Sequence, residues 1–152
     1  GETINYAIGQ GYLAITPIQV MNMMAAVANG GNIVKPYIVR KIDRTPIAHE
    51  KIKKLAAGDG TINEIRRGLY EVANNENGTG KHARVEGLIV AGKTGTAQNP
   101  HGRTHAWFAG FAPYDNPNVC LVVFLEHGGK GGLGAAEIAH GIFEEAKRTG
   151  YL

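Results

Sequence analysis

The chain of 152 residues has a formal net charge of +3, and 43% of its residues are hydrophobic. A chain of this length and composition can bury one hydrophobic core, which excludes a disordered protein. The basic residues are scattered, so we expect no nucleic-acid surface. The sequence also shows no stretch long enough to cross a bilayer and no signal-peptide pattern at its start.

The first clear helix is predicted to begin after Thr16. Thr16 can act as the N-cap, Pro17 suits the first helical position, and Gln19 completes a Thr-x-x-Gln capping box. Apolar residues lie on two faces of this helix, so we expect it to be buried on most sides and to end at residues 29–31. Residues 33–42 then predict an edge strand or extended segment, because a proline interrupts their branched residues.

The pattern is weak over residues 43–60, and a second helix is predicted after them. Thr61 and Glu64 form another capping box, followed by an apolar stripe at helical spacing. The glycine- and asparagine-rich residues 74–80 end this helix.

Three strands follow, over residues 87–97, 104–112 and 119–126, joined by short turns rich in proline, glycine and asparagine. The first opens with the branched run at 88–91, which is typical of a buried strand. Short connections require antiparallel neighbours. Alanine and isoleucine at helical spacing over 135–146 predict a final helix across the sheet. The expected fold is therefore α+β, with an antiparallel sheet flanked by helices.

The segment Gly92-Lys93-Thr94-Gly95-Thr96 is the most informative chemical feature. Lys93 offers a positive charge, and Thr94 and Thr96 offer hydroxyls on one side of the strand, which together could hold a carboxylate. Gly95 leaves room for a substrate backbone against the strand. The main-chain N–H of Thr96 could then donate to a reacting carbonyl, as half of an oxyanion hole.

A nucleotide-binding interpretation also matches these letters. Gly87, four residues, then Gly92-Lys93-Thr94 fit the P-loop pattern G-x-x-x-x-G-K-[ST]. In a P-loop, however, the lysine and threonine open a helix, whereas here the four intervening residues look like a strand, and glycine and proline downstream stop a helix from starting. A helix beginning at Lys93 would support the P-loop, and a strand would exclude it.

Three other features have structural explanations. His101 and His105 would lie about 13 Å apart on an extended strand, too far to share one ion, so we expect no metal site. We expect no cofactor either. Cys120 lies within an apolar strand and is interpreted as a small core residue rather than a nucleophile. The glycine-rich residues 128–132 let the last strand turn into the final helix, and anion binding by Lys130 and its neighbours is the alternative.

Six segments together resemble one known family. They are AGKTGTAQ at 91–98, HAWFAGFAP at 105–113, IGQGY at 8–12, TPIQ at 16–19, ANGG at 28–31 and EHGG at 126–129. In this order they resemble the class B penicillin-binding proteins, and within them the penicillin-binding protein 2 branch of elongation transpeptidases. The resemblance covers nearly the whole chain.

The resemblance implies acyl transfer. A serine would attack the amide before the terminal D-alanine of a peptidoglycan stem peptide, and β-lactams would imitate that substrate. Lys93, Thr94, Gly95 and Thr96 would bind the substrate, with Thr96 and Lys93 as the catalytic residues. Lys93 has two candidate roles, either holding the carboxylate or tuning proton transfer through a neighbouring motif.

The family's nucleophile motif S-x-x-K and its S-x-N motif are absent, and the 152 residues contain no serine. We therefore expect residues 1–152 to be the C-terminal portion of a penicillin-binding transpeptidase domain, inactive alone and prone to self-association through uncovered apolar surface. The resemblance implies a parent anchored in the bacterial inner membrane, with this domain on the periplasmic side and other cell-wall elongation proteins as partners. The anchor would lie outside this chain. A non-catalytic β-lactam-sensing domain of the same fold is the alternative.

Overall fold

A computed structural model describes residues 2–47 and 53–152, and its centre is a three-stranded antiparallel sheet. The strands are β5 (Ala91–Ala97), β6 (His105–Ala112) and β7 (Val119–Leu125), in the order β5-β6-β7. The predicted meander is thus confirmed. Among the described residues no further strand pairs with β5, so one edge of this strand is open.

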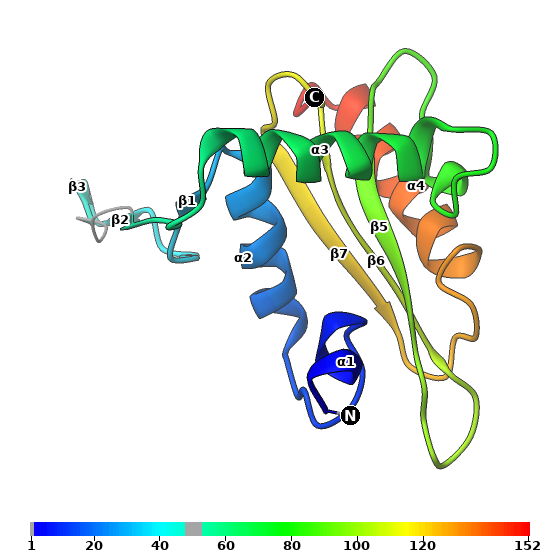
Figure 1. Ribbon diagram of the computed structural model, residues 1–152. Coiled ribbons are helices and arrows are strands. Elements are labelled where there is room, and N and C mark those ends of the chain that lie inside the picture. The colour runs from blue at the N-terminus through cyan, green and yellow to red at the C-terminus, as the bar shows by residue number, and fades with distance from the viewer. Residues whose placement is uncertain (1, 48–52) are drawn as a thin grey trace.

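Helices cover both faces of the sheet, as Figure 1 shows. The C-terminal helix α4 (Gly134–Arg148) and the short 3₁₀ helix η1 (Lys81–Ala83) lie on one face. The helices α2 (Pro17–Ala28) and α3 (Asp59–Asn74) lie on the other. The expected α+β class, with an antiparallel sheet flanked by helices, is confirmed.

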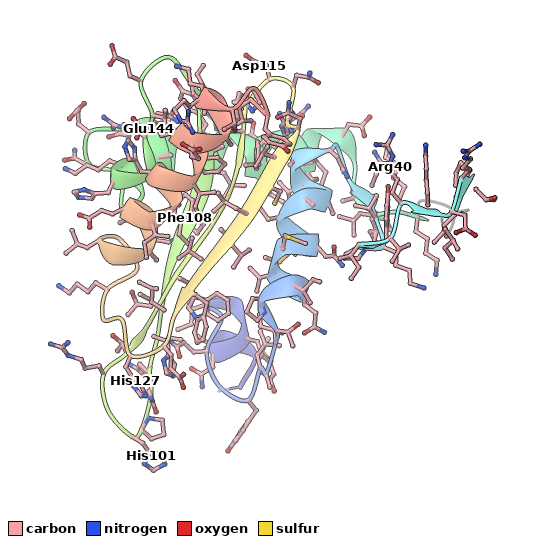
Figure 2. The ribbon with its side chains drawn as sticks, turned by 180° about the vertical axis from the view of Figure 1, so that it is seen from behind. Arg40, His101, Phe108, Asp115, His127 and Glu144 are labelled. Atoms are coloured by element: carbon pink, nitrogen blue, oxygen red, sulfur yellow. The ribbon has the colours of Figure 1, made fainter. Side chains whose placement is uncertain are left out.

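Strand alternation divides the core into two layers. Phe108 of β6 is fully buried toward α4, together with Phe143 of that helix, and Figure 2 shows Phe108 between the sheet and α4. Phe111 points to the other face, where it packs with Met24 of α2 and Leu69 of α3. The edge strand β5 is therefore held between two packed layers.

The start of α2 follows the prediction, and its burial does so in part. The Thr16 hydroxyl accepts a hydrogen bond from the backbone N–H of Gln19, and the Thr16 N–H donates to the side-chain oxygen of Gln19. Asn29 is the C-cap. Ile18 and Met23 are nevertheless 53% and 59% exposed. Burial on most sides is confirmed for the second half of the helix, where Met24, Ala26 and Ala28 are buried although Met24 and Ala26 lie on nearly opposite sides.

The predicted start of α3 is also wrong. The helix begins at Asp59, with Gly58 as an N-cap that makes no side-chain hydrogen bond, so Thr61 lies inside the first turn and caps nothing. Farther along α3, the Arg66 guanidinium donates to the Ala28 and Tyr114 carbonyls. It also stacks over the rings of Phe111 and Tyr114. Arg66 thereby joins α3, the end of α2 and the turn after β6.

The segment between α2 and α3 is extended and short-stranded, in agreement with the prediction for residues 33–42. Its two small antiparallel pairs are β1 (Asn32–Ile33) with β4 (Lys53–Lys54), and β2 (Lys41–Ile42) with β3 (Thr45–Pro46). The weak pattern at 43–60 falls partly on residues 48–52, which lie outside the described residues.

The start of the first sheet strand and the presence of an N-terminal helix differ from the prediction. The first sheet strand starts at Ala91 rather than residue 87, because Gly87 adopts a positive φ of 65° and an isolated bridge joins Val85 to Leu88. The apolar run 88–91 follows this turn as an irregular segment that leads into β5, and Val90 within it is fully buried. The helix α1 (Glu2–Ala7) was not predicted, since its residues from 3 on are exposed and lack an apolar face.

Within the described residues, no helix combines the length and apolar character needed to cross a membrane.

Candidate active site at the open edge of β5

The strand register decides which way each motif side chain points. Thr94 and Thr96 lie opposite Phe108 and Ala106, whose side chains are in the α4-facing core. Lys93 lies opposite Ala109, which belongs to the core on the α2 side. The two threonines therefore share a face, as the sequence predicted, and the lysine side chain leaves the strand from the opposite face.

Both threonine hydroxyls have partners on the α4 side. The hydroxyls of Thr79 and Thr94 are 2.9 Å apart, and the Thr96 hydroxyl accepts a hydrogen bond of 3.3 Å from the Gly131 N–H. Thr79 belongs to the loop before η1, and Gly131 lies in the glycine-rich segment before α4. The hydroxyls are thus fixed in position, and each retains capacity for another hydrogen bond.

The ammonium group of Lys93 reaches the open edge of the strand. Its Nζ donates a 2.7 Å hydrogen bond to the Thr94 carbonyl, and the Nε2 amide of Gln10 donates a 3.2 Å bond to the Thr96 carbonyl. These carbonyls therefore point away from β6. In an extended strand the N–H and C=O of one residue point to the same side, so the Thr96 N–H also faces the open edge.

Gly95 has a packing reason as well as the predicted one. A Cβ atom at this position would lie 3.2 Å from Cβ of Trp107, its partner on β6. The Trp107 ring in turn packs on Phe124, with 4.3 Å between ring centroids. Any side chain at Gly95 would push against this aromatic pair as well as against a peptide lying along the edge.

Two cavities meet at this strand, one on each face, and both are lined by Thr94 and Thr96. The first has a volume of about 440 Å³ and is mostly apolar. It is lined by Lys93, Gly95 and Trp107 on the sheet side, and across from them by a wall of Ile8, Gln10, Leu13, Ile15, Val20 and Met23. An amide or acyl chain running along the β5 edge would lie against this wall.

The second cavity, of about 460 Å³, is cationic. Its lining includes Lys81 and His82 from η1 and Lys130 from the glycine-rich segment, beside Thr79, Thr94 and Thr96. None of the residues that line it carries a carboxylate. Threonine hydroxyls of one strand therefore stand between an apolar cavity and a basic one.

The histidines considered for a metal site, His101 and His105, do not line the cavities at this edge. His101 lies at a loop tip beyond the end of the sheet, and Figure 2 shows His127 near the same end. His127 N–H donates to Nδ1 of His105 at 3.0 Å. Among residues 2–47 and 53–152 no group of three or more histidine, cysteine or acidic side chains could hold a metal ion.

Cys120 is partly buried against the core on the α2 side. Burial raises the pKa of its thiol to about 11, and the thiol contacts the Met21 carbonyl at 3.7 Å. A thiol with a raised pKa carries little thiolate at neutral pH and is a poor nucleophile, which agrees with a packing role.

The P-loop hypothesis is contradicted. Lys93 and Thr94 lie within β5, whose regular pairing with β6 extends from Ala91 to Ala97. No helix starts at the lysine, so there is no helix N-terminus to receive a phosphate.

Two residues of the site were missed by sequence reasoning alone. Thr79 was only part of a predicted loop, and Gln10 was noted only as part of a segment resembling a family. Each contacts the motif across a long sequence separation, 15 residues for Thr79 and 86 for Gln10. No local periodicity signals such contacts. The resemblance at IGQGY was the one available hint for Gln10.

Comparison with known proteins identifies the family. Residues 1–144 match the model of the penicillin binding protein transpeptidase domain. A curated relative, peptidoglycan D,D-transpeptidase MrdA of Haemophilus influenzae, is 35% identical over 95% of this chain. The aligned region makes up 25% of that relative, so the chain spans about a quarter of its length.

Solved structures agree with this match. Penicillin-binding protein 2 of Pseudomonas aeruginosa, in complex with WCK 5153, gives a TM-score of 0.85 at 32% identity, covering 95% of this chain and 32% of the other. Penicillin-binding protein 2 of Helicobacter pylori, in complex with MreC, gives 0.84 at 31% identity, covering 100% and 28%. The chain therefore belongs to the penicillin-binding protein transpeptidase domain family.

Proposed function

We propose that this chain supplies the substrate-carboxylate site and one oxyanion donor of a peptidoglycan D,D-transpeptidase. The observation that carries the proposal is the open edge of β5, where the Lys93 ammonium and the Thr94 and Thr96 carbonyls face away from β6. A peptide can add to such an edge as an extra strand, through main-chain hydrogen bonds. The family membership agrees with this use of the edge.

The proposed reaction is acyl transfer from a D-alanyl-D-alanine peptide. A serine oxygen outside these 152 residues attacks the carbonyl carbon before the terminal D-alanine, and the C–N bond breaks. The D-alanine amine leaves with a proton, and the rest of the donor stays bound to the serine oxygen as an acyl-enzyme. The amine of a neighbouring peptide strand then attacks the ester, so that a new amide forms and the serine oxygen recovers its proton. β-Lactams bind as imitations of this donor.

In this proposal Lys93, Thr94 and Thr96 hold the terminal carboxylate of the donor, and Gly95 lets its backbone approach the strand. The Thr96 N–H joins a second donor, beside the serine, in stabilising the tetrahedral oxyanion. A fixed donor of this kind typically accounts for about a hundredfold to a thousandfold in rate. Thr96 and Lys93 are therefore the catalytic residues of the chain, and neither a metal nor a cofactor is needed.

We also propose that residues 1–152 form the C-terminal portion of the transpeptidase domain. The curated relative is about four times as long as the region it shares with this chain. Apolar surface away from the cavity, at Tyr12 and Ile38, is exposed in the described structure. Further segments of the parent would cover it, whereas the chain alone would self-associate through it. Light scattering that shows only monomer, with a cooperative melt, would contradict this expectation.

For the whole parent we propose a membrane-anchored protein with this domain on the periplasmic side, where peptidoglycan is built. Its partners would be stem peptides, β-lactams and other elongation proteins. The Helicobacter pylori relative was solved in complex with MreC. We expect the parent to bind a protein partner in the same way.

Fluorescent-penicillin labelling tests the proposal. The full-length parent should be labelled covalently, and unlabelled penicillin should block this labelling. The 152-residue chain alone should not be labelled, because it lacks a serine. The control is heat-denatured parent. Labelling of the chain alone would overturn the assignment of the nucleophile, and a parent that binds penicillin but transfers no acyl group to an amine would favour a sensing domain.

A further inference from the structure

We propose that His105 is a positioning residue for Thr96. It holds the corner at residues 126–129, after β7, through a hydrogen bond from the His127 N–H to Nδ1 of its ring. We call this contact the latch. Protonation of the His105 ring opens the latch and releases the corner. The effect on the reaction rests on the proposed function, whereas the geometry of the latch and its response to pH do not.

The latch joins the start of β6 to the turn that follows β7. The His127 N–H donates to Nδ1 of His105 at 3.0 Å, so Nδ1 acts as an acceptor, which requires the neutral ring. A second proton on the ring would sit on Nδ1 and point at the His127 N–H. Two donors would then face each other, and the hydrogen bond would be lost. The latch is therefore closed at neutral pH and opens as the pH falls through the range in which imidazole takes up a proton.

His127 is held in a conformation that few side chains adopt. Its φ is 54°, in the left-handed region that favours glycine. Its ring Nδ1 lies 3.2 Å from the Arg103 carbonyl oxygen and 3.3 Å from the side-chain amide nitrogen of Asn99. The backbone and the ring of His127 are thus both tied to the segment that leads into β6. Without the latch, the backbone loses one of the contacts that hold it in this conformation.

The charges around the latch add to the effect of pH. The ring centroids of His105 and His127 are 5.0 Å apart. From β7 the Phe124 ring faces His105, with centroids 5.5 Å apart, and on β5 the strand partner is Ala97. The other titratable side chains of the two loops that meet there are His101, Arg103, Glu126 and Lys130. Protonation of both histidines places like charges on the two sides of the latch, which repel each other.

The corner leads directly to the motif strand. The Gly129 N–H donates to the Thr104 carbonyl at 2.9 Å, and the Thr104 hydroxyl donates to the Gly129 carbonyl at 2.9 Å. Farther along, the Gly131 backbone lies so close to β5 that an added Cβ would overlap the Gly95 carbonyl oxygen. The Gly131 N–H donates to the Thr96 hydroxyl at 3.3 Å. A shift of the corner therefore moves the donor that orients Thr96.

The test is the pH profile of fluorescent-penicillin labelling of the full-length parent, with His105→Asn as the main variant. The asparagine Oδ1 lies where Nδ1 of histidine lies, so it can accept from the His127 N–H, and it takes up no proton. The variant should be labelled at the rate of the unchanged parent at about pH 7.5, and about three- to tenfold faster than the parent at about pH 5.5. Taking the ratio of the two rates cancels the titration of the catalytic groups that both proteins share.

Two further variants separate the latch from simple packing. His105→Phe keeps an aromatic ring against Phe124 but offers no acceptor. It should be slower than the parent by the same factor at about pH 7.5 and equal to it at about pH 5.5. His101→Asn, at the tip of the loop before β6 (Figure 2), should keep a constant ratio to the parent across this range. A constant ratio for His105→Asn, or an unchanged rate for His105→Phe at neutral pH, would overturn the inference.

Hydrogen exchange of the full-length parent gives a readout that needs no acylation. At about pH 5.5 the backbone amides of residues 126–131 should exchange about three- to tenfold faster in the parent than in His105→Asn, and at about pH 7.5 equally fast. Comparing the two proteins at one pH removes the intrinsic effect of pH on exchange. Equal exchange at both pH values would overturn the latch. A parent that takes up no penicillin at any pH would contradict the proposed function, and the exchange rates would still decide the latch.

Discussion

The side-chain amide of Gln10 donates a hydrogen bond to the carbonyl of Thr96, which ties the segment before α2 to the open edge of β5. We expect Gln10→Ala to lower the free energy of unfolding by about 0.5–1 kcal/mol, since the bond is exposed and neutral. Urea unfolding of the chain measures this. Gln98→Ala, at an exposed position just past the end of β5, is the matched control and should change nothing. An equal effect of both variants would show that the contact contributes no stability.

Gly92 is predicted to be irreplaceable for packing. A Cβ there would lie 2.6 Å from the Phe108 ring and 2.7 Å from the Ala109 carbonyl oxygen. Gly92→Ala should cost about 1–3 kcal/mol in unfolding free energy, because neither the ring nor the backbone can move away. Gly141→Ala in α4 meets nothing within 4 Å. It should stabilise the chain by about 0.5–1 kcal/mol. A harmless Gly92→Ala would mean that the β5–β6 pair is looser than described.

The single cysteine supplies a chemical test of the core. Since burial raises the pKa of Cys120 to about 11, its thiolate is scarce at pH 8, and alkylation by iodoacetamide should be about a hundredfold slower in the folded chain than in urea. The rate should climb as the pH rises toward 11. Mass spectrometry of the intact chain follows the reaction. Equal rates in folded and unfolded protein at pH 8 would show that β7 is not packed against α2.

Lys93 is expected to act in binding. Lys93→Met in the full-length parent should raise the penicillin concentration for half-labelling by about tenfold or more, because a charged hydrogen bond to the carboxylate is lost. A change in the maximal rate of labelling alone would favour the other candidate role, in proton transfer. Lys53→Met is the control for nonspecific loss of charge. An unchanged half-labelling concentration would count against the carboxylate assignment.

Local signals in the sequence were reliable where local chemistry decides the structure. The capping box at Thr16 and Gln19 forms because its partners are three residues apart. The same pattern at Thr61 failed, because Gly58 and Asp59 already start α3 one turn earlier. Apolar runs were ambiguous in another way. Val90 is fully buried as predicted, yet it lies before β5, since burial alone does not distinguish a strand from a packed irregular segment.

In the candidate site, too, the features set by local sequence were predicted and those set by the tertiary fold were not. Strand alternation placed Thr94 and Thr96 on one face from the sequence alone. The partners that fix them, Thr79 and Gly131, come from distant loops and follow only from the tertiary fold. The sequence also led us to expect the motif at a sheet edge, and β5 is an outer strand of the meander.

The Thr96 N–H is the central element of this account, and substitution by proline tests it most directly. Proline deletes that N–H and is tolerated on the open edge of a strand, whereas Thr96→Ala keeps the N–H and removes only the hydroxyl. The measurement is the rate of fluorescent-penicillin labelling of the full-length parent carrying each change. We predict a loss of at least about a hundredfold for Thr96→Pro and less than about tenfold for Thr96→Ala. Labelling of Thr96→Pro at the normal rate would contradict the account.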